Sequence, residues 1–323
     1  MKVKELKPSL TIQKLQALSE RVKESSGKLP LIQSDLRKFM SGYNGEKSLE
    51  YYLSFLPNDQ YYVLHDVRLF NGTHFFQLDL LIISPCFVAI VEVKNMSGHL
   101  TFDGKFNQVV QTKNGEQKAF PDPMLQLQKQ ISQYRSWLKK NGYPEIPIHG
   151  FIVMSNPYTI LTSENYEDDN LIIRPQTLVS NLQTLMNYYE THPLPHRIIK
   201  KISKQTLKNH ISDHTSILLR YGLKRSDIHP GVKCPQCSFL PMDRIYKFWR
   251  CINCDFKSKD AHFTAVRDYF LLLSDTITNQ QCREFLLIDC LALANRLLQS
   301  TPHLTKSGHY KSTFYTISEQ INL

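Results

Sequence analysis

The sequence contains no long apolar run. Its N-terminus, MKVKELKPSLTIQKL, carries Lys and Glu where a signal peptide needs an unbroken apolar stretch, and the longest apolar runs have only the length of a strand. We therefore expect a soluble, cytoplasmic protein without membrane partners. Internal repeats and low-complexity tracts are also missing. Hydrophobic residues make up 41% and charged residues 21% of 323 positions, which excludes collagen-like and wholly disordered classes and predicts two or three domains.

Acidic residues are in deficit. Lys and Arg together number 39 and Asp and Glu number 29, so the formal net charge is +10. A basic surface attracts phosphates at long range, and the excess therefore favours a polyanionic partner. Much of it falls between Arg197 and Lys257, where β patterning is weak. We interpret residues 191–232 as a basic helical linker, with a solvated helix face as the alternative.

Cysteine is scarce outside one short segment. Three of the seven cysteines stand alone, which argues against a disulfide framework, and the other four form two CxxC pairs. Two such knuckles facing one ion complete a tetrahedral Zn²⁺ site, and a closed site of four thiolates is structural rather than catalytic. A redox dithiol is the competing interpretation. We place a zinc ribbon at residues 233–260. Its predicted ligands are Cys234, Cys237, Cys251 and Cys254.

Residues 42–190 alternate between helical and strand patterns. GYNGEKSLEYYLSFL predicts a helix, and YYVLHDVRLF, FFQLDLLIIS and FVAIVEVKN predict three antiparallel strands, the first two joined by a turn at Asn71-Gly72. A helix from Pro123 to Gly142, two more buried strands and a last helix follow. We expect a compact α/β domain here, preceded by an N-terminal helical segment at residues 1–41.

Charged residues inside two of these strands indicate chemistry. Asp79 lies in an apolar strand, and Glu92 and Lys94, two positions apart, project to one face of the next strand. A carboxylate in a sheet interior is retained only if it is paired or binds a metal. Mg²⁺ prefers a few carboxylates with water and phosphate oxygens, and this set suits phosphodiester hydrolysis. The structural alternative is an Asp79–Lys94 salt bridge with Glu92 at a solvated strand end.

Residues 42–130 resemble the nuclease-related domain family (NERD), a branch of the PD-(D/E)XK nuclease superfamily. The matching stretches are GYNGE at 42–46, QLDLLIIS at 77–84, FVAIVEVKNMSGHLTFDGKFNQ at 87–108 and DPMLQ at 122–126. The resemblance implies an α/β restriction-endonuclease-like core, a mixed sheet flanked by helices. The chain departs from the family pattern at Asp122-Pro123 and Asp79-Leu80, and neither change removes a predicted metal ligand.

The resemblance also implies roles for five residues. Asp79 and Glu92 would bind Mg²⁺ or Mn²⁺, and Lys94, two residues after the Glu, would be catalytic. Glu46, on the preceding helix, would be a metal-site or orienting carboxylate. Gln126, on the following helix, would complete the catalytic set.

Residues 261–323 are similar to a winged helix-turn-helix domain. FTAVRDYFLLLSD predicts a helix, and two helices around a short turn and a hairpin with Gly308 at its tip follow. Such a domain places one helix in the major groove and its wing on the backbone. A small helical bundle used for dimerisation is the alternative. The candidate DNA contacts are Asn295, Arg296 and Gln299 on the helix and Lys306, His309 and Lys311 on the wing.

These features together predict a Mg²⁺-dependent DNA endonuclease in DNA processing or in defence against foreign DNA. The zinc ribbon and the winged-helix-like domain would target it to duplex DNA, and a homodimer is compatible with this interpretation. The alternatives are a catalytically inactive DNA-binding or scaffold protein with a nuclease-derived fold, and an enzyme directed at RNA.

Overall fold

A computed structural model describes residues 1–189 and 193–317 of the chain. Contacts divide the chain into two compact units. Unit 1 comprises Met1–Lys7 and Phe39–Ser212, and unit 2 comprises Pro8–Lys38 and the chain from Asp213 onward. The polypeptide therefore passes between the units three times. No helix in the described ranges is long and apolar enough to cross a membrane.

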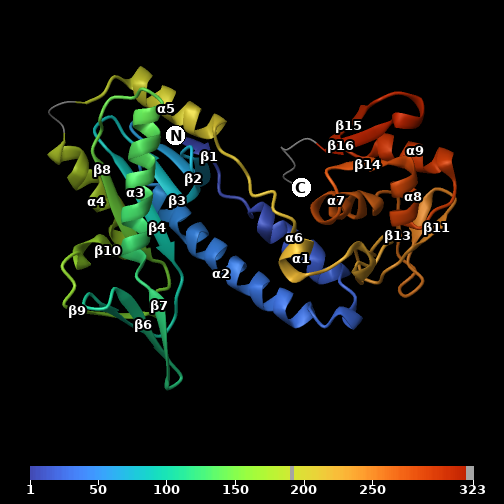
Figure 1. Cartoon of the computed structure of the whole chain (residues 1–323), viewed down its shortest axis with the longest axis horizontal. Coiled ribbons are helices and arrows are strands. Elements are labelled where there is room, and N and C mark those ends of the chain that lie inside the picture. The colour runs from blue at the N-terminus through green and yellow to red at the C-terminus, as the bar shows by residue number, and fades with distance from the viewer. Residues whose placement is uncertain (190–192, 318–323) are drawn as a thin grey trace. The chain divides into compact units, whose positions relative to one another are not determined.

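Unit 1 is built on a mixed sheet with helices on both faces (Figure 1). Its strands lie in the order β1 (Lys2–Lys4), β2 (Tyr62–Phe70), β3 (Phe75–Ile83), β4 (Val88–Lys94), β8 (Ile148–Met154) and β10 (Ile172–Ile173). The pairs β2–β3 and β3–β4 are antiparallel, whereas β1–β2, β4–β8 and β8–β10 are parallel. The helices are α3 (Pro123–Lys140), α4 (Pro175–Tyr188), α5 (His196–Lys208) and α2 (Leu29–Leu53), which enters unit 1 at Phe39 and begins in unit 2.

Helices cover the two faces of this sheet in pairs. Trp137 of α3 and Ile199 of α5 belong to one apolar cluster with the strands, and Leu49 of α2 and Leu182 of α4 belong to the cluster on the opposite face. Because both faces are covered, the central strands are apolar at nearly every position, as in the run LLII of β3. The predicted α/β class and the three predicted antiparallel strands are confirmed. The helix predicted from Gly42 begins earlier, at Leu29.

A second sheet in unit 1 follows directly after β4. Its strands lie in the order β7 (Glu116–Pro121), β6 (Gln108–Lys113), β5 (His99–Asp103) and β9 (Ile160–Glu164). The sequence pattern does not predict β6 and β7, because most of their side chains are polar, those of β6 being largely half-buried and those of β7 largely exposed. The signal for their hairpin is Asn114-Gly115, a pair with positive φ values of 52° and 81°.

Unit 2 contains helices and two small sheets. The helices are α1 (Leu10–Arg21), α6 (Ile217–Tyr221), α7 (His262–Leu272), α8 (Asn279–Leu286) and α9 (Leu291–Ser300). One sheet has the order β11 (Asp243–Ile245), β12 (Phe248–Arg250) and β13 (Lys257–Ser258), and the other β14 (Thr276–Thr278), β16 (Phe314–Ile317) and β15 (Leu304–Ser307). Short 3₁₀ turns occur at 24–26 and 225–227 and at 310–312, with a fourth at 169–171 in unit 1.

A buried ion pair anchors α1 within unit 2. Arg21 Nε donates to Asp268 Oδ2 of α7 at 2.7 Å, and both side chains are 1% exposed. The Arg21 guanidinium also donates to the carbonyls of His229 and Gly231. Leu15 and Leu18 of α1 pack into the same apolar core. Residues 8–38 are therefore integral to unit 2.

Candidate active site

β3 and β4 separate where the predicted catalytic residues lie. Their pairing ends at Leu80 and Val91, although each strand continues along its other neighbour. Beyond the split, the backbone N–H of Val93 donates to Asp79 Oδ2 at 2.9 Å. The Asp79 carboxylate thus accepts the hydrogen bond of a backbone N–H that no longer pairs with β3. The fork between the strands fixes Asp79 against the segment that carries Glu92 and Lys94.

Lys94 is held by two acceptors at the end of β4. Its ammonium donates to Glu92 Oε1 at 2.6 Å and to Gln126 Oε1 of α3 at 3.0 Å. The Lys94 side chain remains 27% exposed, whereas Glu92 is 2% exposed. Glu92 therefore does not lie at a solvated strand end, and among the described residues Lys94 pairs with Glu92 rather than with Asp79. The buried Glu92 carboxylate fixes the Lys94 ammonium, and the partly exposed ammonium can contact an anion that arrives from solvent.

Gln130 belongs to the site, although the strand pattern does not indicate it. Its side-chain amide donates to Glu92 Oε2 at 2.7 Å and to the carbonyl of Gln77 at 3.0 Å. Gln126 and Gln130 are four positions apart on α3, so they lie on one face of the helix. That spacing is the signal that identifies Gln130 from sequence. Both oxygens of Glu92 are thereby held by donors.

Gly45 allows α2 to approach the ends of β4 and β8. A Cβ at this position would lie 2.7 Å from Asn95 Cβ and 2.8 Å from Ser155 Oγ. Asn95 in turn donates its side-chain N–H to the carbonyl of Ser41 at 2.8 Å. The contact brings Glu46, the next residue of α2, to the carboxylates of the fork. The glycine of the GYNGE stretch is therefore required by close packing.

Burial and mutual repulsion disfavour the ionised forms of Glu46 and Asp79. Burial raises the pKa of Glu46 well above its usual range, and Asp79, Asp66 and Glu92 raise it further. Burial also raises the pKa of Asp79, with Glu92 adding to the effect and the Val93 N–H opposing it. Each group disfavours ionisation of its neighbours. A divalent cation bound among them would relieve this repulsion.

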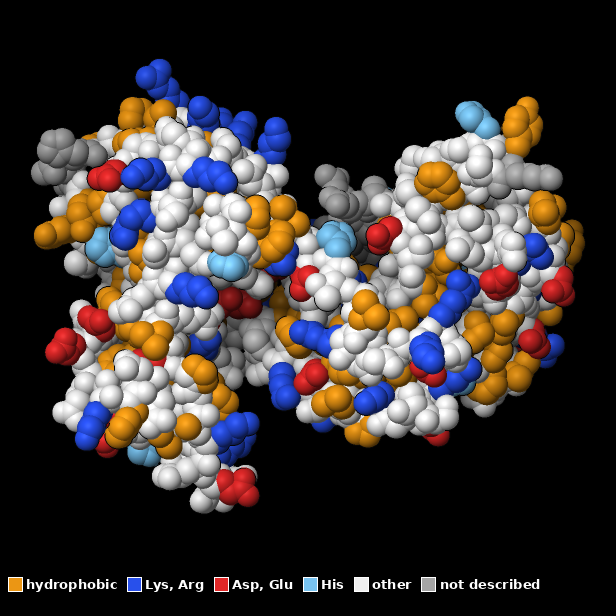
Figure 2. Space-filling model, in the orientation of Figure 1, with side chains coloured by type: hydrophobic (Ala, Val, Ile, Leu, Met, Phe, Trp, Pro, Cys, Tyr) orange, Lys and Arg blue, Asp and Glu red, His pale blue; other side chains and the backbone are white. Residues whose placement is uncertain are grey.

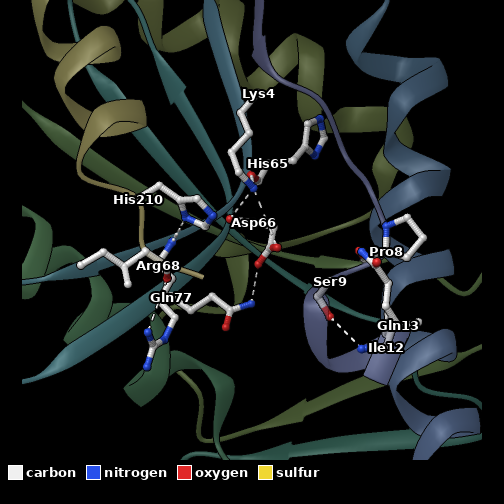
Figure 3. Close-up of polar contacts among 11 residues, drawn as sticks. Lys4, Pro8, Ser9, Ile12, Gln13, His65, Asp66, Arg68, Gln77 and His210 are labelled. Atoms are coloured by element: carbon white, nitrogen blue, oxygen red, sulfur yellow. Dashed lines mark hydrogen bonds and ion pairs between the residues drawn. The ribbon is translucent and has the colours of Figure 1, made fainter. Parts of the chain in front are cut away.

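Lys4 and Asp66 extend the site towards the edge of the sheet (Figure 3). The Lys4 ammonium donates to the carbonyls of His65 and Asp66 at 2.8 and 2.7 Å and lies 3.8 Å from Asp66 Oδ2. Asp66 has a left-handed φ of 49°, and its Oδ1 accepts from Gln77 at 2.8 Å. Lys4 opposes the rise in the pKa of Glu46. The sequence pattern gives no sign of this role, because β1 is only three residues long.

The carboxylates of the fork suit a hard cation, such as Mg²⁺, that takes few of its ligands from the protein. Among the described residues, the only group of three or more His, Cys, Asp or Glu ligand atoms within 4.8 Å of one another is formed by the four ribbon cysteines. The carboxylates of the fork thus do not form a closed cage. Mg²⁺ typically takes one or two carboxylates and keeps water or phosphate oxygens as its other ligands. Asp79 and Glu92 meet that requirement.

The model of one protein family, described as the nuclease-related domain (NERD), matches residues 41–155. Residues 41–155 are a nuclease-related domain. Neither the curated proteins nor the solved structures include a match to the chain. The nuclease-related domain implies a PD-(D/E)XK-like fold, and the mixed sheet flanked by helices agrees with it. The predicted resemblance is confirmed over residues 41–155, and this range contains all five predicted catalytic positions.

The four cysteines outside the nuclease-related domain cluster as a zinc ribbon requires. The sulfurs of Cys234 and Cys254 are 3.7 Å apart and those of Cys237 and Cys251 are 3.5 Å apart. Zn–S bonds of about 2.3 Å in a tetrahedron place sulfurs about 3.8 Å apart, so the cluster has the size of a Zn²⁺ site. The β11–β12 hairpin lies between the two CxxC pairs.

The two CxxC pairs also have the same local backbone. Ser238 and Asp255, which follow the second cysteine of each pair, have left-handed φ values of 62° and 61°. Their N–H groups donate to the carbonyls of the first cysteine at 3.0 and 2.9 Å. Each pair therefore forms a tight loop that turns both thiols inward. This repeated geometry is compatible with a structural zinc site.

The candidate DNA contacts of unit 2 differ in exposure. Asn295 is half-buried, and its Oδ1 accepts from Asn279 Nδ2 at 2.7 Å, so it connects α9 to α8. Thr278 caps α8, and Cys290 directly precedes α9. The side chain of Lys311 lies outside the described part of the structure. The exposed candidates are Arg296, Gln299, Lys306 and His309.

Proposed function

We propose that the protein is a divalent-metal-dependent DNA nuclease in which the nuclease-related domain hydrolyses phosphodiester bonds. The observation that carries this proposal is the environment of Lys94. Its ammonium has three N–H donors, and two of them are occupied by Glu92 and Gln126. The third has no acceptor among the described residues, on a side chain that solvent reaches. It can donate to a water molecule or to a phosphate oxygen.

Each residue of the fork has a different role in the proposed hydrolysis. Asp79 and Glu92 would hold Mg²⁺ or Mn²⁺, and the chemistry that this ion would supply is polarisation of the phosphodiester and activation of water. The Val93 N–H orients Asp79. Lys94 positions the attacking water and stabilises the negative charge that develops on the phosphate. Glu46 and Gln126 complete the surroundings of these groups, Gln126 by holding Lys94.

Unit 2 delivers the nuclease to duplex DNA in this proposal. The order of α7, β14, α8, α9 and the β15–β16 hairpin supports a winged helix-turn-helix domain, as does the strand order β14–β16–β15. Arg296 and Gln299 would reach base edges, and Lys306 and His309 would contact the backbone. Asn295 would position α9, because α8 already engages its side chain. The zinc ribbon would support this assembly.

Cleavage assays on supercoiled plasmid and on linear duplex DNA test the catalytic proposal. The wild type should cut DNA with Mg²⁺ or Mn²⁺ and not with EDTA. Asp79→Ala and Lys94→Ala should each lower the cleavage rate by about 100-fold or more while DNA affinity changes little. Gln128→Ala, an exposed position on the same helix as Gln126, is the matched control. A wild type that binds DNA and cuts it with neither metal would identify an inactive DNA-binding protein instead.

A further inference from the structure

α3 and α5 carry basic residues and no acidic ones. Neither PMLQLQKQISQYRSWLKK nor HRIIKKISKQTLK contains Asp or Glu. Figure 2 shows Lys and Arg side chains gathered over α5, along the upper edge of unit 1. We call the exposed lysines of α5 and of the C-terminal end of α3 the α3–α5 basic surface. Its residues are Lys139, Lys140, Lys200, Lys201, Lys204 and Lys208.

The two helices form one continuous surface because they are joined at Gln205. The side-chain amide of Gln205 donates to Asn141 Oδ1 at 2.9 Å, at the end of α3. Gln205 Oε1 accepts from the Tyr143 hydroxyl at 2.8 Å. Lys201 lies over the ring of Tyr143, 6.0 Å from its centroid. The lysines of both helices thus project from a single packed structure.

The fold itself does not explain these lysines. Lys200, Lys204 and Lys208 are four positions apart, and like charges at this spacing destabilise a helix. In the described residues no carboxylate pairs with any of the three. The helix dipole favours cations in the last turn, which accounts for Lys208 but not for Lys200 and Lys204. A negatively charged partner would remove the repulsion between them.

A phosphate backbone suits this surface better than a lipid headgroup layer. Amphipathic helices bind membranes by inserting an apolar face. The apolar face of α5 is buried against the sheet, where Ile199 and Ile202 are 0% exposed. The face of α5 that a partner can reach carries four exposed lysines and one exposed apolar residue, Leu207. A rigid polyanion can neutralise such a row of charges without any apolar contact.

α3 connects the basic surface to the active site. Gln126 holds Lys94 near one end of the helix, and Lys140 lies at the other end, about 21 Å away at 1.5 Å per residue. Since a duplex rises about 3.4 Å per base pair, this distance corresponds to about six base pairs. We propose that the α3–α5 basic surface binds the phosphate backbone of the DNA substrate about half a helical turn from the bond that is cleaved. This inference rests on the proposed function for the identity of the substrate.

Equilibrium binding of the full chain to a labelled 30-base-pair duplex tests the surface. Every protein carries Lys94→Ala so that the DNA stays intact in Mg²⁺. Adding Lys200→Gln, Lys204→Gln and Lys208→Gln should weaken binding by about tenfold or more, and should reduce the slope of log Kd against log salt by about 2 to 3, since each lost phosphate contact contributes about 0.9. Replacing the same three lysines by arginine should preserve both values.

A second triple variant controls for net charge. Lys28→Gln, Arg37→Gln and Lys38→Gln remove three exposed cations outside the surface and should leave affinity within about twofold of the parent. Equal losses in both triple variants, or no loss in the α5 variant, would overturn the proposal. So would vesicles of phosphatidylcholine and phosphatidylserine that displace the DNA from the parent protein. A wild type that never cleaves DNA would contradict the proposed function and leave this binding result intact.

Discussion

Gln130 shows how single side chains orient the charges of the active site. Its amide holds Glu92 Oε2, while Lys94 holds Oε1. Both oxygens of the Glu92 carboxylate, which is 2% exposed, therefore accept a hydrogen bond. The alternation of strand residues singles out Asp79, Glu92 and Lys94, and the family resemblance supplies the roles predicted for them. It cannot predict Gln130 or Lys4, because these reach the site from α3 and β1, whose packing is decided by the tertiary fold.

Removing the Gln130 amide should impair both catalysis and stability. Gln130→Leu leaves Glu92 Oε2 buried without its donor, which should lower the free energy of unfolding by about 1 to 3 kcal/mol. The cleavage rate should fall by about 10- to 100-fold, as is common when a residue that orients a metal ligand is lost. Urea unfolding and plasmid cleavage measure the two effects. Gln128→Leu, exposed on the same helix, should change neither, and an active, fully stable Gln130→Leu protein would contradict this role.

His65 should make unit 1 less stable in acid. The residue is 1% exposed, neither ring nitrogen has a hydrogen-bond partner within residues 1–189 and 193–317, and burial lowers its pKa to about 4. Glu50 opposes the lowering, whereas Lys2 and Lys4 add to it. The unfolded chain takes up the proton near pH 6.5 and the folded protein only near pH 4. The stability linked to neutral His65 is therefore complete above pH 6.5 and is lost as the pH falls towards 4.

His65→Leu tests this dependence. The variant should lack the loss of stability between pH 6.5 and 4, which amounts to up to about 3 kcal/mol at 1.36 kcal/mol per pKa unit. Urea unfolding can be followed in a Trp249→Phe background, where Trp137 reports on unit 1 alone, because the chain has only two tryptophans. Parallel curves of stability against pH for the two proteins would exclude the proposed titration.

At the level of elements, the fork between β3 and β4 is the feature that creates the site. The individual strands are predictable, since near-continuous apolar runs mark strands covered on both faces. The fork is not, because the point at which two strands separate depends on their other neighbours, β2 and β8. The β6–β7 hairpin shows a second reason for failure, since polar strands carry little hydrophobic pattern. The cluster of four cysteines was predictable, because the CxxC spacing itself encodes the loop geometry.

Zinc should be integral to the ribbon. Metal analysis should find about one Zn²⁺ per chain, and Cys237→Ser should lose it, because three thiolates no longer close a structural site. Loss of the metal should also expose Trp249, which is 1% exposed beside the cluster, and shift its fluorescence to longer wavelength. Cys290→Ser, another exposed cysteine, is the matched control. Purified wild type that contains no zinc would refute the assignment.

At the level of the whole molecule, each of the two units is built from two separate segments, and the segments of the two units alternate along the chain. Residues 8–38 pack in unit 2 through α1 and its Arg21–Asp268 ion pair, while Lys2–Lys4 form a strand in unit 1. Local sequence patterns predict α1 as a helix but give no sign of its partner, because that partner lies more than 200 residues later. Composition likewise predicts a basic protein without showing that α5 packs in unit 1.

This alternation has a consequence for synthesis on the ribosome. All of unit 1 has emerged once Ser212 leaves the tunnel, whereas the 111 residues 213–323 of unit 2 have still to emerge. At 5–20 residues per second, this interval lasts about 5 to 20 s. During this interval, residues 8–38 are connected to unit 1 at both ends. The apolar face of α1 has not yet met the residues that it packs against in unit 2. A nascent chain can therefore complete unit 1 before unit 2, and α1 lacks its packing partners during this interval.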